Sequence, residues 1–204
     1  MRIVSGTLRG RRIVYYGDRA TRPMKDRTRE SVFNILGHIT PTTVAIDLFA
    51  GTGALGIEAL SRGASRAEFF ETSTDALKAL GENAEQLGIA DRCTMRNADA
   101  FRRAKRTGDP AEGPWLWFCC PPYAMVETRR SNFLEMMEDF AARAPKGSRF
   151  VFEVEENEDL SWFPFESAWD WRRYSPAWVG ILDVNSLRDG SAATAPEEPS
   201  AEEE

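Results

Sequence analysis

Apolar and polar segments alternate along most of the chain, with the lengths expected of strands and helices. Five short apolar segments predict strands at residues 42–50, 66–71, 93–97, 115–119 and 149–154. The segments between them predict helices at residues 54–62, 73–87, about 100–105 and 127–143. Strands that alternate with helices form a mostly parallel sheet covered on both faces. The predicted fold class is therefore α/β, a doubly wound Rossmann-like sheet.

The N-terminal end departs from this alternation. Residues 1–16 contain two strand-like segments that predict a small β-hairpin, and a helix from about residue 25 to residue 37 follows. Nine Arg and Lys residues stand against three acidic residues in residues 1–30, which gives this segment a net charge of +6. A solvated surface is one explanation, but the concentration of charge beside glycine-rich loops favours a phosphate-binding arm. The candidate phosphate-binding residues are Arg9, Arg11, Arg12, Arg22, Lys25 and Arg27.

The C-terminal end also has its own pattern. Residues 169–174 and 178–184 flank a Ser-Pro-Ala turn and predict an antiparallel hairpin that completes the sheet. Four of the six tryptophans lie between residues 162 and 178, where covering the sheet is favoured over stacking on bases. The segment from Asp189 has no apolar periodicity and six acidic residues, so it is predicted to be disordered. The expected units are an N-terminal basic extension (1–40), a main domain (41–186) and an acidic tail (187–204).

Length and composition limit the protein classes that fit. A chain of 204 residues suffices for one domain with a substantial core and a small extension. No apolar run has the length of a membrane span, and the N-terminus does not resemble a signal peptide. Three cysteines, two of them adjacent, do not make a disulfide framework, so a reducing cytoplasm is expected. A single histidine excludes a histidine-rich metal site and a Ser/His/Asp triad.

The segment after the first strand has the pattern of a nucleotide-binding turn. Gly51, Gly53 and Gly56 have the spacing G-x-G-x-x-G between a predicted strand and a predicted helix. Glycines allow a tight turn, and the helix N-terminus offers free N–H groups to a ligand. Glu71 lies 20 residues after Gly51, at the end of the next strand. A carboxylate at that place can accept hydrogen bonds from ribose hydroxyls.

Two aspartates help to distinguish the possible ligands. The glycine pattern alone fits a dinucleotide-dependent dehydrogenase and a methyltransferase equally. Asp47, four residues before Gly51, would repel a pyrophosphate but suits the positive charges of S-adenosylmethionine. Asp99 follows the third strand, where it could accept a hydrogen bond from an adenine amine or cap the next helix. Both roles of Asp99 remain open.

A second candidate site follows the fourth strand, where Cys119 and Cys120 precede Pro121, Pro122 and Tyr123. The carboxyl ends of neighbouring strands line one crevice in a doubly wound sheet, which places this turn opposite the glycine turn. The prolines fix the backbone, so that their carbonyls become rigid acceptors. Tyr123 offers a stacking face, and a flipped base with an exocyclic amine fits this arrangement. A simple strand-ending turn is the alternative, and the double proline favours a binding site.

These motifs resemble known enzymes. The segment from Asp47 to Gly53, with Glu71, Asp99 and the Pro121-Pro122-Tyr123 turn, resembles the class I amino-methyltransferases. The N-terminal basic extension (residues 1–40, the basic head) is similar to that of the RsmD family. Enzymes of this family methylate the N2 amine of one guanine in bacterial small-subunit ribosomal RNA. This similarity is carried by residues 1–6, 9–11, 21–23 and 26–36, and the resemblance extends over about residues 1–184.

The resemblance implies a cofactor, a substrate and a set of site residues. The cofactor is S-adenosyl-L-methionine, and the partner is ribosomal RNA or a small-subunit assembly particle, with no membrane and with the protein as a cytoplasmic monomer. Metal is not required. The implied cofactor-binding residues are Asp47, Phe49, Gly51, Gly53, Glu71 and Asp99. The implied catalytic residues are Cys120, Pro121, Pro122 and Tyr123, and the basic candidates of the head become RNA-binding residues.

One position departs from the family pattern. The family has Asp or Asn before the double proline, where this chain has Cys120. In the family, that side chain accepts a hydrogen bond from the target amine, whereas a protonated thiol is a weak acceptor. Losing one well-placed catalytic hydrogen bond typically lowers a rate by about 10²–10³. Two alternatives therefore stay open beside an active methyltransferase: a catalytically weak RNA-binding relative, and a nicotinamide-dependent oxidoreductase suggested by the glycine pattern.

Overall fold

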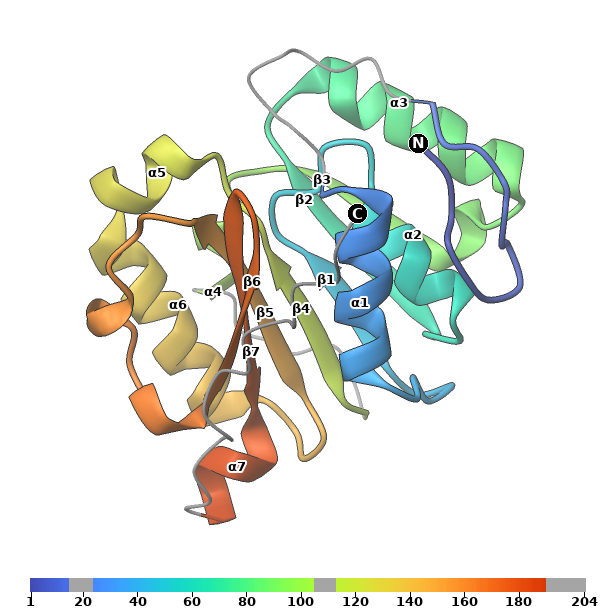
Figure 1. The fold of residues 1–204 in the computed structure, drawn as a ribbon. Helices are drawn as coiled ribbons and strands as arrows, with labels where there is room; N and C mark the ends of the chain where they lie inside the picture. Colours follow the sequence, from blue (N-terminus) through green and yellow to red (C-terminus); the bar gives the residue numbers. More distant parts are fainter. Residues whose placement is uncertain (15–23, 105–112, 190–204) are drawn as a thin grey trace, which may run out of the picture.

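A seven-stranded sheet forms the centre of the computed structural model, which describes residues 1–14, 24–104 and 113–189 (Figure 1). The strand order is β3-β2-β1-β4-β5-β7-β6. β1 to β5 are parallel, β7 is antiparallel to β5, and β6 is antiparallel to β7. The predicted α/β class and the C-terminal hairpin are thereby confirmed. The strands are β1 (Val44–Asp47), β2 (Arg66–Glu71), β3 (Cys93–Asn97), β4 (Trp115–Cys119), β5 (Arg149–Glu155), β6 (Trp169–Tyr174) and β7 (Ala177–Asp183).

Helices cover both faces of the sheet (Figure 1). On one face, α1, α2 and α3 form a single apolar cluster with the sheet, in which Phe33 of α1 packs against Phe118 of β4 and α3 covers β2 and β3. On the other face, Phe140 of α6 packs against Trp115 and Trp117 of the same strand, and α4 packs against α6. β4 is buried along its whole length, as its apolar sequence predicts. The helices are α1 (Asp26–Leu36), α2 (Ala54–Ser61), α3 (Thr74–Leu87), α4 (Phe101–Ala104), α5 (Tyr123–Thr128), α6 (Arg130–Arg143) and α7 (Val184–Asp189), with single 3₁₀ turns at Ala90–Arg92, Leu160–Trp162 and Glu166–Ala168.

The strand order places a candidate site at the middle of the sheet. The chain runs outward from β1 to β3 and then returns to β4, which pairs with the other side of β1. At such a reversal, the connections after the two neighbouring strands leave in opposite directions and open a crevice at the carboxyl ends. The segments after β1 and β4 are the glycine turn and the Cys120–Tyr123 turn.

The predicted hairpin in residues 1–16 is reduced to one antiparallel bridge, between Arg2 and Arg12. The reason is a competing acceptor on α2. Ile3 N donates to Arg11 O at 2.9 Å, but the next two N–H groups, of Val4 and Ser5, donate to the carboxylate oxygens of Glu58 at 2.8 and 2.9 Å, so the ladder ends at Ile3. Residues 15 and 16, the end of the second predicted strand, lie outside the described residues.

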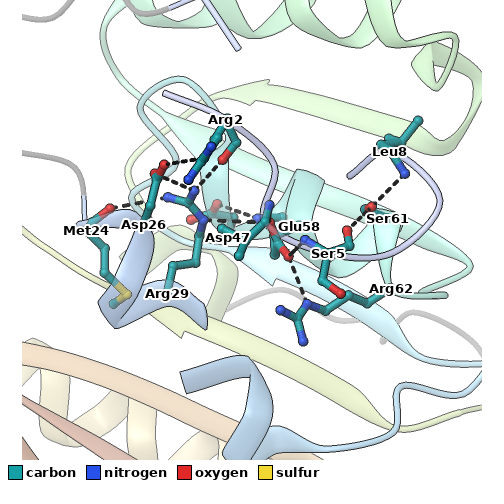
Figure 2. A network of polar contacts seen from close by, with 12 residues as sticks. Arg2, Ser5, Leu8, Met24, Asp26, Arg29, Asp47, Glu58, Ser61 and Arg62 are labelled. Carbon is teal, nitrogen blue, oxygen red and sulfur yellow. Dashed lines mark hydrogen bonds and ion pairs between the residues drawn. The ribbon is translucent and has the colours of Figure 1, made fainter. Parts of the chain in front are cut away.

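One of the nine basic residues of the head is a core residue. Arg29 of α1 is fully buried, donates to the carboxylate of Asp26 at 2.8 Å and to the carbonyl of Arg2, and lies 3.7 Å from Glu58 (Figure 2). Glu58 is also fully buried and accepts a hydrogen bond from Arg62 at 2.8 Å. Arg29 therefore joins α1, α2 and the N-terminal segment rather than the phosphate-binding surface.

The predicted helix at residues 127–143 is two helices. α5 starts at Tyr123, because Pro122 at the preceding position has a fixed φ of −53° that suits a helix start. The backbone breaks at Arg129, whose φ is −130°, and α6 then begins at Arg130. The Thr128 hydroxyl donates back to the carbonyl of Ala124 at 3.0 Å, a bond that competes with the regular helix at this break.

Two further differences concern the ends of elements. The predicted strand 42–50 is shorter in the structure, since the turn already begins at Leu48. A short helix, α7, continues to Asp189, past residue 187 where the tail was expected to begin. Its start is tied to β7 because Asn185 N donates to Asp183 at 2.8 Å. Residues 190–204 lie outside the described part of the chain.

Trp162, Trp169 and Trp171 pack with Phe163 in the apolar cluster beside the C-terminal hairpin. Within the described ranges, no helix is long and apolar enough to cross a membrane.

Candidate active site

A cavity of about 940 Å³ opens at the carboxyl ends of β1, β2, β4 and β5. This volume is large enough to enclose a nucleoside-sized ligand. The turns after β1 and β4 both contribute to its wall, as the sequence predicts for a doubly wound sheet. Predicted site residues on the wall are Asp47, Phe49, Gly51, Glu71, Asp99, Cys120, Pro121, Pro122, Tyr123 and Lys25.

The glycine turn is shaped by positive backbone angles and close packing. Gly51 and Gly53 have φ values of 52° and 83°, which L side chains rarely adopt. A Cβ on Gly53 would meet Leu80 at 2.3 Å, and one on Gly56 would meet Phe69 at 2.3 Å. No atom lies within 4 Å of the corresponding point on Gly51. Gly51 therefore leaves room beside the backbone, whereas Gly53, which is not on the cavity wall, allows the helix to approach the sheet.

Asp47 places a carboxyl group at the floor of the cavity. The residue is 2% exposed, and its Oδ2 accepts a hydrogen bond from Gly56 N at 3.1 Å. Burial raises the pKa of this carboxyl from 3.8 to about 7, the Gly56 bond opposes the rise, and the charge of Glu71 adds to it. A cation bound next to Asp47 would stabilise the ionised form and lower this pKa again.

This raised pKa predicts a specific pH dependence of stability. The folded protein binds the Asp47 proton more tightly than the unfolded chain, so Asp47 destabilises the fold progressively as the pH rises from about 4 to about 7. The variant Asp47→Asn cannot ionise there. Its free energy of unfolding relative to the wild type should increase by on the order of 3 kcal/mol between pH 4.5 and pH 8. Urea unfolding of both proteins at several pH values measures this difference, and a difference that does not change with pH would contradict the buried position of Asp47.

Glu71 holds the glycine turn from the neighbouring strand. Its Oε2 accepts a hydrogen bond from Gly51 N at 2.8 Å. Its Oε1 accepts from Thr72 N at 2.7 Å and from Ser73 N at 2.8 Å. A carboxylate held by three backbone N–H groups is fixed in orientation, and it is partly exposed on the cavity wall. The predicted contact between Glu71 and ribose hydroxyls remains a prediction that this geometry permits.

Asp99 and Phe49 form another part of the wall. Asp99 Oδ1 accepts from Phe101 N at 3.0 Å at the start of α4, so the capping role is present. Its Oδ2 lies 3.2 Å from Arg129 Nη1, and Arg129 lies over the Phe101 ring at 5.5 Å from the centroid. The ring of Phe49 packs against Phe101 and Phe133, with centroids 6.2 and 6.0 Å apart. Contact of Asp99 and Phe49 with a cofactor stays a prediction.

The Cys120–Tyr123 turn is tied to β5 by a residue that the sequence analysis missed, Glu153. The Tyr123 hydroxyl donates to Glu153 Oε1 at 3.0 Å, and Cys120 lies beside Glu153 at the carboxyl end of the neighbouring strand. Burial, followed by the charge of Glu153, raises the pKa of Cys120 and of Tyr123, so both groups stay protonated donors. A polar residue at the end of the apolar segment 149–154 was the available signal for Glu153.

Asn83 of α3 is a second missed residue. Its amide oxygen accepts from Val14 N at 2.7 Å, and its amide nitrogen donates to the carbonyls of Val14 and Thr52 at 3.0 and 3.3 Å. Thr52 belongs to the glycine turn, so one buried side chain connects the N-terminal segment to the cavity wall. A lone asparagine in a helix carries no sequence signal for such a role.

The predicted phosphate-binding residues have different positions. Arg9, Arg11 and Arg12 are exposed on the N-terminal segment, which runs beside α2 and α3 (Figure 1). Arg11 donates to the carbonyl of Gln86 in α3 at 2.8 Å. Lys25 and Arg27 are exposed at the start of α1, and Lys25 is on the cavity wall. Arg22 lies outside the described residues.

Comparison with known proteins adds independent information. A family model described as "Conserved hypothetical protein 95" matches residues 1–162. The "Putative rRNA methyltransferase YlbH" of Bacillus subtilis is 31% identical over 140 residues, which are 69% of this chain and 75% of that protein. The "Ribosomal RNA small subunit methyltransferase D" of Escherichia coli K12 is 34% identical over 123 residues, 60% of either chain. The solved structure of a hypothetical protein from Thermus thermophilus, TTHA0928, has a TM-score of 0.70 at 25% identity and covers 90% of this chain and 99% of its own.

Proposed function

Because the chain belongs to the RsmD-type family, whose model is described as "Conserved hypothetical protein 95", we propose that it is an S-adenosylmethionine-dependent methyltransferase that acts on ribosomal RNA. The specific reaction is transfer of a methyl group to the N2 amine of a guanine in the small-subunit RNA. One observation carries the proposal: a single cavity has the glycine turn with the buried Asp47 on one side and the Pro121-Pro122-Tyr123 turn on the other.

The donor set at the glycine turn fits this cofactor. Asp47 is a buried carboxyl whose pKa of about 7 is a sign of an uncompensated charge, and a cationic ligand relieves that cost. Gly51 leaves space for close approach of a ligand to the backbone, and the carboxylate of Glu71 is held at the same turn. When bound, S-adenosylmethionine supplies a methyl group on a positively charged sulfur. The same charge pattern disfavours a nicotinamide dinucleotide, since Asp47 would repel its pyrophosphate.

The opposite wall suits a planar base with an amine. Pro121 and Pro122 have no N–H group, so the carbonyls of this turn are rigid acceptors. Tyr123 lies next to them on the wall as an aromatic side chain. A guanine flipped out of its stack can lie against such a ring while its N2 hydrogens point at carbonyl oxygens. Holding the amine in line with the methyl group supplies much of the acceleration expected of such a site.

The exposed basic residues supply the RNA-binding part of the proposal. Lys25 at the cavity and Arg27 on the same helix carry positive charge at the start of α1. Arg9, Arg11 and Arg12 extend the charge along the N-terminal segment. Lys and Arg contacts to phosphate position a nucleic acid without reading its sequence. A ribosomal RNA or an assembly particle that contains it is the partner that this distribution supports.

The experiment that tests the proposal has two readouts on the same protein. Isothermal titration with S-adenosylmethionine measures cofactor binding, and transfer of a labelled methyl group to unmodified 30S particles measures catalysis. Binding together with transfer is the expected result. Tight binding without transfer would instead favour a catalytically weak RNA-binding relative, the second candidate, which the thiol at position 120 motivates.

The variant Cys120→Asp compares these two candidates directly. If the native site is fully active, the rate of the variant should stay within about tenfold of the wild type. An added carboxylate would lie next to Glu153, and two adjacent carboxyls cannot both ionise easily, so little acceptor strength is gained. Single-turnover methyl transfer to 30S particles measures both rates. A gain of about 100-fold or more would show that the native site lacks an acceptor.

A further inference from the structure

Glu153 is placed at the reactive side of the cavity by the register of the sheet. β4 and β5 are parallel, and Cys119 pairs with Phe152, so the next residues, Cys120 and Glu153, lie side by side at the carboxyl ends. Glu153 is half-buried and lies on the cavity wall together with Pro121 and Tyr123. Its carboxylate is held in position by the Tyr123 hydroxyl, which donates to Oε1 at 3.0 Å.

We propose that Glu153 is a catalytic residue, whose carboxylate accepts the hydrogen bond and then the proton of the target amine. The inference rests on the proposed function, because it assigns a role within that reaction. It also identifies a group that can accept the hydrogen bond of the target amine in place of the family's Asp or Asn, where this chain has Cys120. The acceptor absent from position 120 is supplied by the neighbouring strand, where the Tyr123 hydroxyl holds it.

The other polar groups of the Cys120–Tyr123 turn are not suited to accept the proton of the amine. Tyr123 is a donor to Glu153, and raised pKa values keep both Cys120 and Tyr123 protonated. A carboxylate has about four lone-pair sites, so the bond from Tyr123 leaves acceptor capacity for an amine. The other carboxylates on the described part of the wall are Asp47, Glu71, Asp75 and Asp99. Glu71 and Asp99 are bonded to backbone N–H groups away from the turn, and Asp47 is bonded to Gly56.

The chemistry requires an acceptor at this point. The N2 lone pair of guanine forms the new N–C bond, while the electron pair of the broken S–C bond stays on sulfur. The nitrogen therefore gains a positive charge and must lose one proton. That proton passes to the Glu153 carboxylate, and the electrons of the N–H bond return to nitrogen. A negative charge next to the amine stabilises the positive charge while it develops.

The test compares Glu153→Gln with Glu155→Gln, an exposed residue on the same strand. Glu153→Gln should lower the rate of methyl transfer to 30S particles by about 100-fold, as expected for loss of a positioned base. Its affinity for S-adenosylhomocysteine should remain within about threefold of the wild type, because the Asp47 side of the cavity is unchanged. The variant Glu153→Asp, which keeps the carboxylate, should recover part of the rate. Glu155→Gln should have the wild-type rate.

A second readout does not depend on catalysis. In the protein without cofactor, burial and then the charge of Glu153 raise the pKa of Cys120. Removing that charge with Glu153→Gln should therefore speed alkylation of Cys120 by iodoacetamide, measured peptide by peptide with mass spectrometry. Glu155→Gln should leave the rate of Cys120 alkylation unchanged. If the wild type is active and Glu153→Gln has the same rate, the catalytic role of Glu153 is overturned, but the proposed function is not. An equal loss of rate and of S-adenosylhomocysteine affinity would also overturn it. An inactive wild type would overturn the proposed function itself.

Discussion

Replacing Asp47 with asparagine is expected to weaken the binding of S-adenosylmethionine by about 100-fold at pH 8, about 2.7 kcal/mol. At this pH the carboxyl is ionised, since its pKa is about 7, and it lies buried at the floor of the cavity. Two opposite charges about 4 Å apart attract by about 4 kcal/mol at an effective dielectric constant of about 20. Losing most of this attraction is enough to account for the expected 100-fold loss of affinity. Isothermal titration at pH 8 measures the affinity of both proteins.

Two controls make this result specific to charge. Asp75→Asn removes an exposed carboxylate from the same cavity wall, and its affinity should stay within about threefold of the wild type, since solvent screens exposed charges. Adenosine has no sulfonium or ammonium group, so Asp47→Asn should barely change its affinity. Equal losses for adenosine and S-adenosylmethionine would show that Asp47 shapes the turn and does not attract a cation.

Replacing Glu58 with alanine should lower the free energy of unfolding by about 3–5 kcal/mol, because the buried Arg29 keeps only Asp26 as a carboxylate partner and two backbone N–H groups lose their acceptor. Arg29 is fully buried 3.7 Å from Glu58, and the N–H groups of Val4 and Ser5 also lose their acceptor (Figure 2). Urea unfolding measures the loss. Amide hydrogen exchange at Val4 and Ser5 should accelerate at the same time.

Glu68→Ala is the matched comparison for this prediction. Glu68 pairs with Arg96 at 3.2 Å, but both side chains are partly exposed, with 14% and 32% of their surface accessible. Such a pair contributes about 0–1 kcal/mol. A Glu58→Ala variant that is destabilised no more than Glu68→Ala would contradict the view that the Arg29–Glu58 network holds the N-terminal segment on the domain.

The central sheet could be predicted because its strands are short apolar runs bounded by turn residues. β2, β3 and β4 begin and end at the predicted residues. The glycine turn was predictable for a similar reason, since positive φ values at Gly51 and Gly53 require that residue type. The start of helix 127–143 was predicted wrongly, because the break at Arg129 depends on local backbone geometry that apolar spacing does not reveal, whereas its end at Arg143 is as predicted.

The missed site residues depend on contacts between distant parts of the chain. Glu153 reaches Cys120 only because β5 pairs with β4 in the register of Phe152 with Cys119. Arg29 belongs to the most basic part of the sequence, yet in the structure it is fully buried and lies 3.7 Å from Glu58 of α2. Charge counting cannot separate such a core arginine from exposed ones such as Arg27. Residue types predicted the chemistry of the cavity, whereas pairing of the strands determines which residues meet there.

Nucleoside analysis of methylated ribosomal RNA tests the proposed function most directly. The protein is incubated with S-adenosylmethionine that carries a deuterated methyl group and with 30S particles from cells that lack this modification. The small-subunit RNA is then digested and its nucleosides are identified by mass spectrometry. The predicted result is deuterated N2-methylguanosine at about one residue per particle, absent with Asp47→Asn at low cofactor concentration. Label in another nucleoside, or no label while the cofactor binds tightly, would contradict the proposed function.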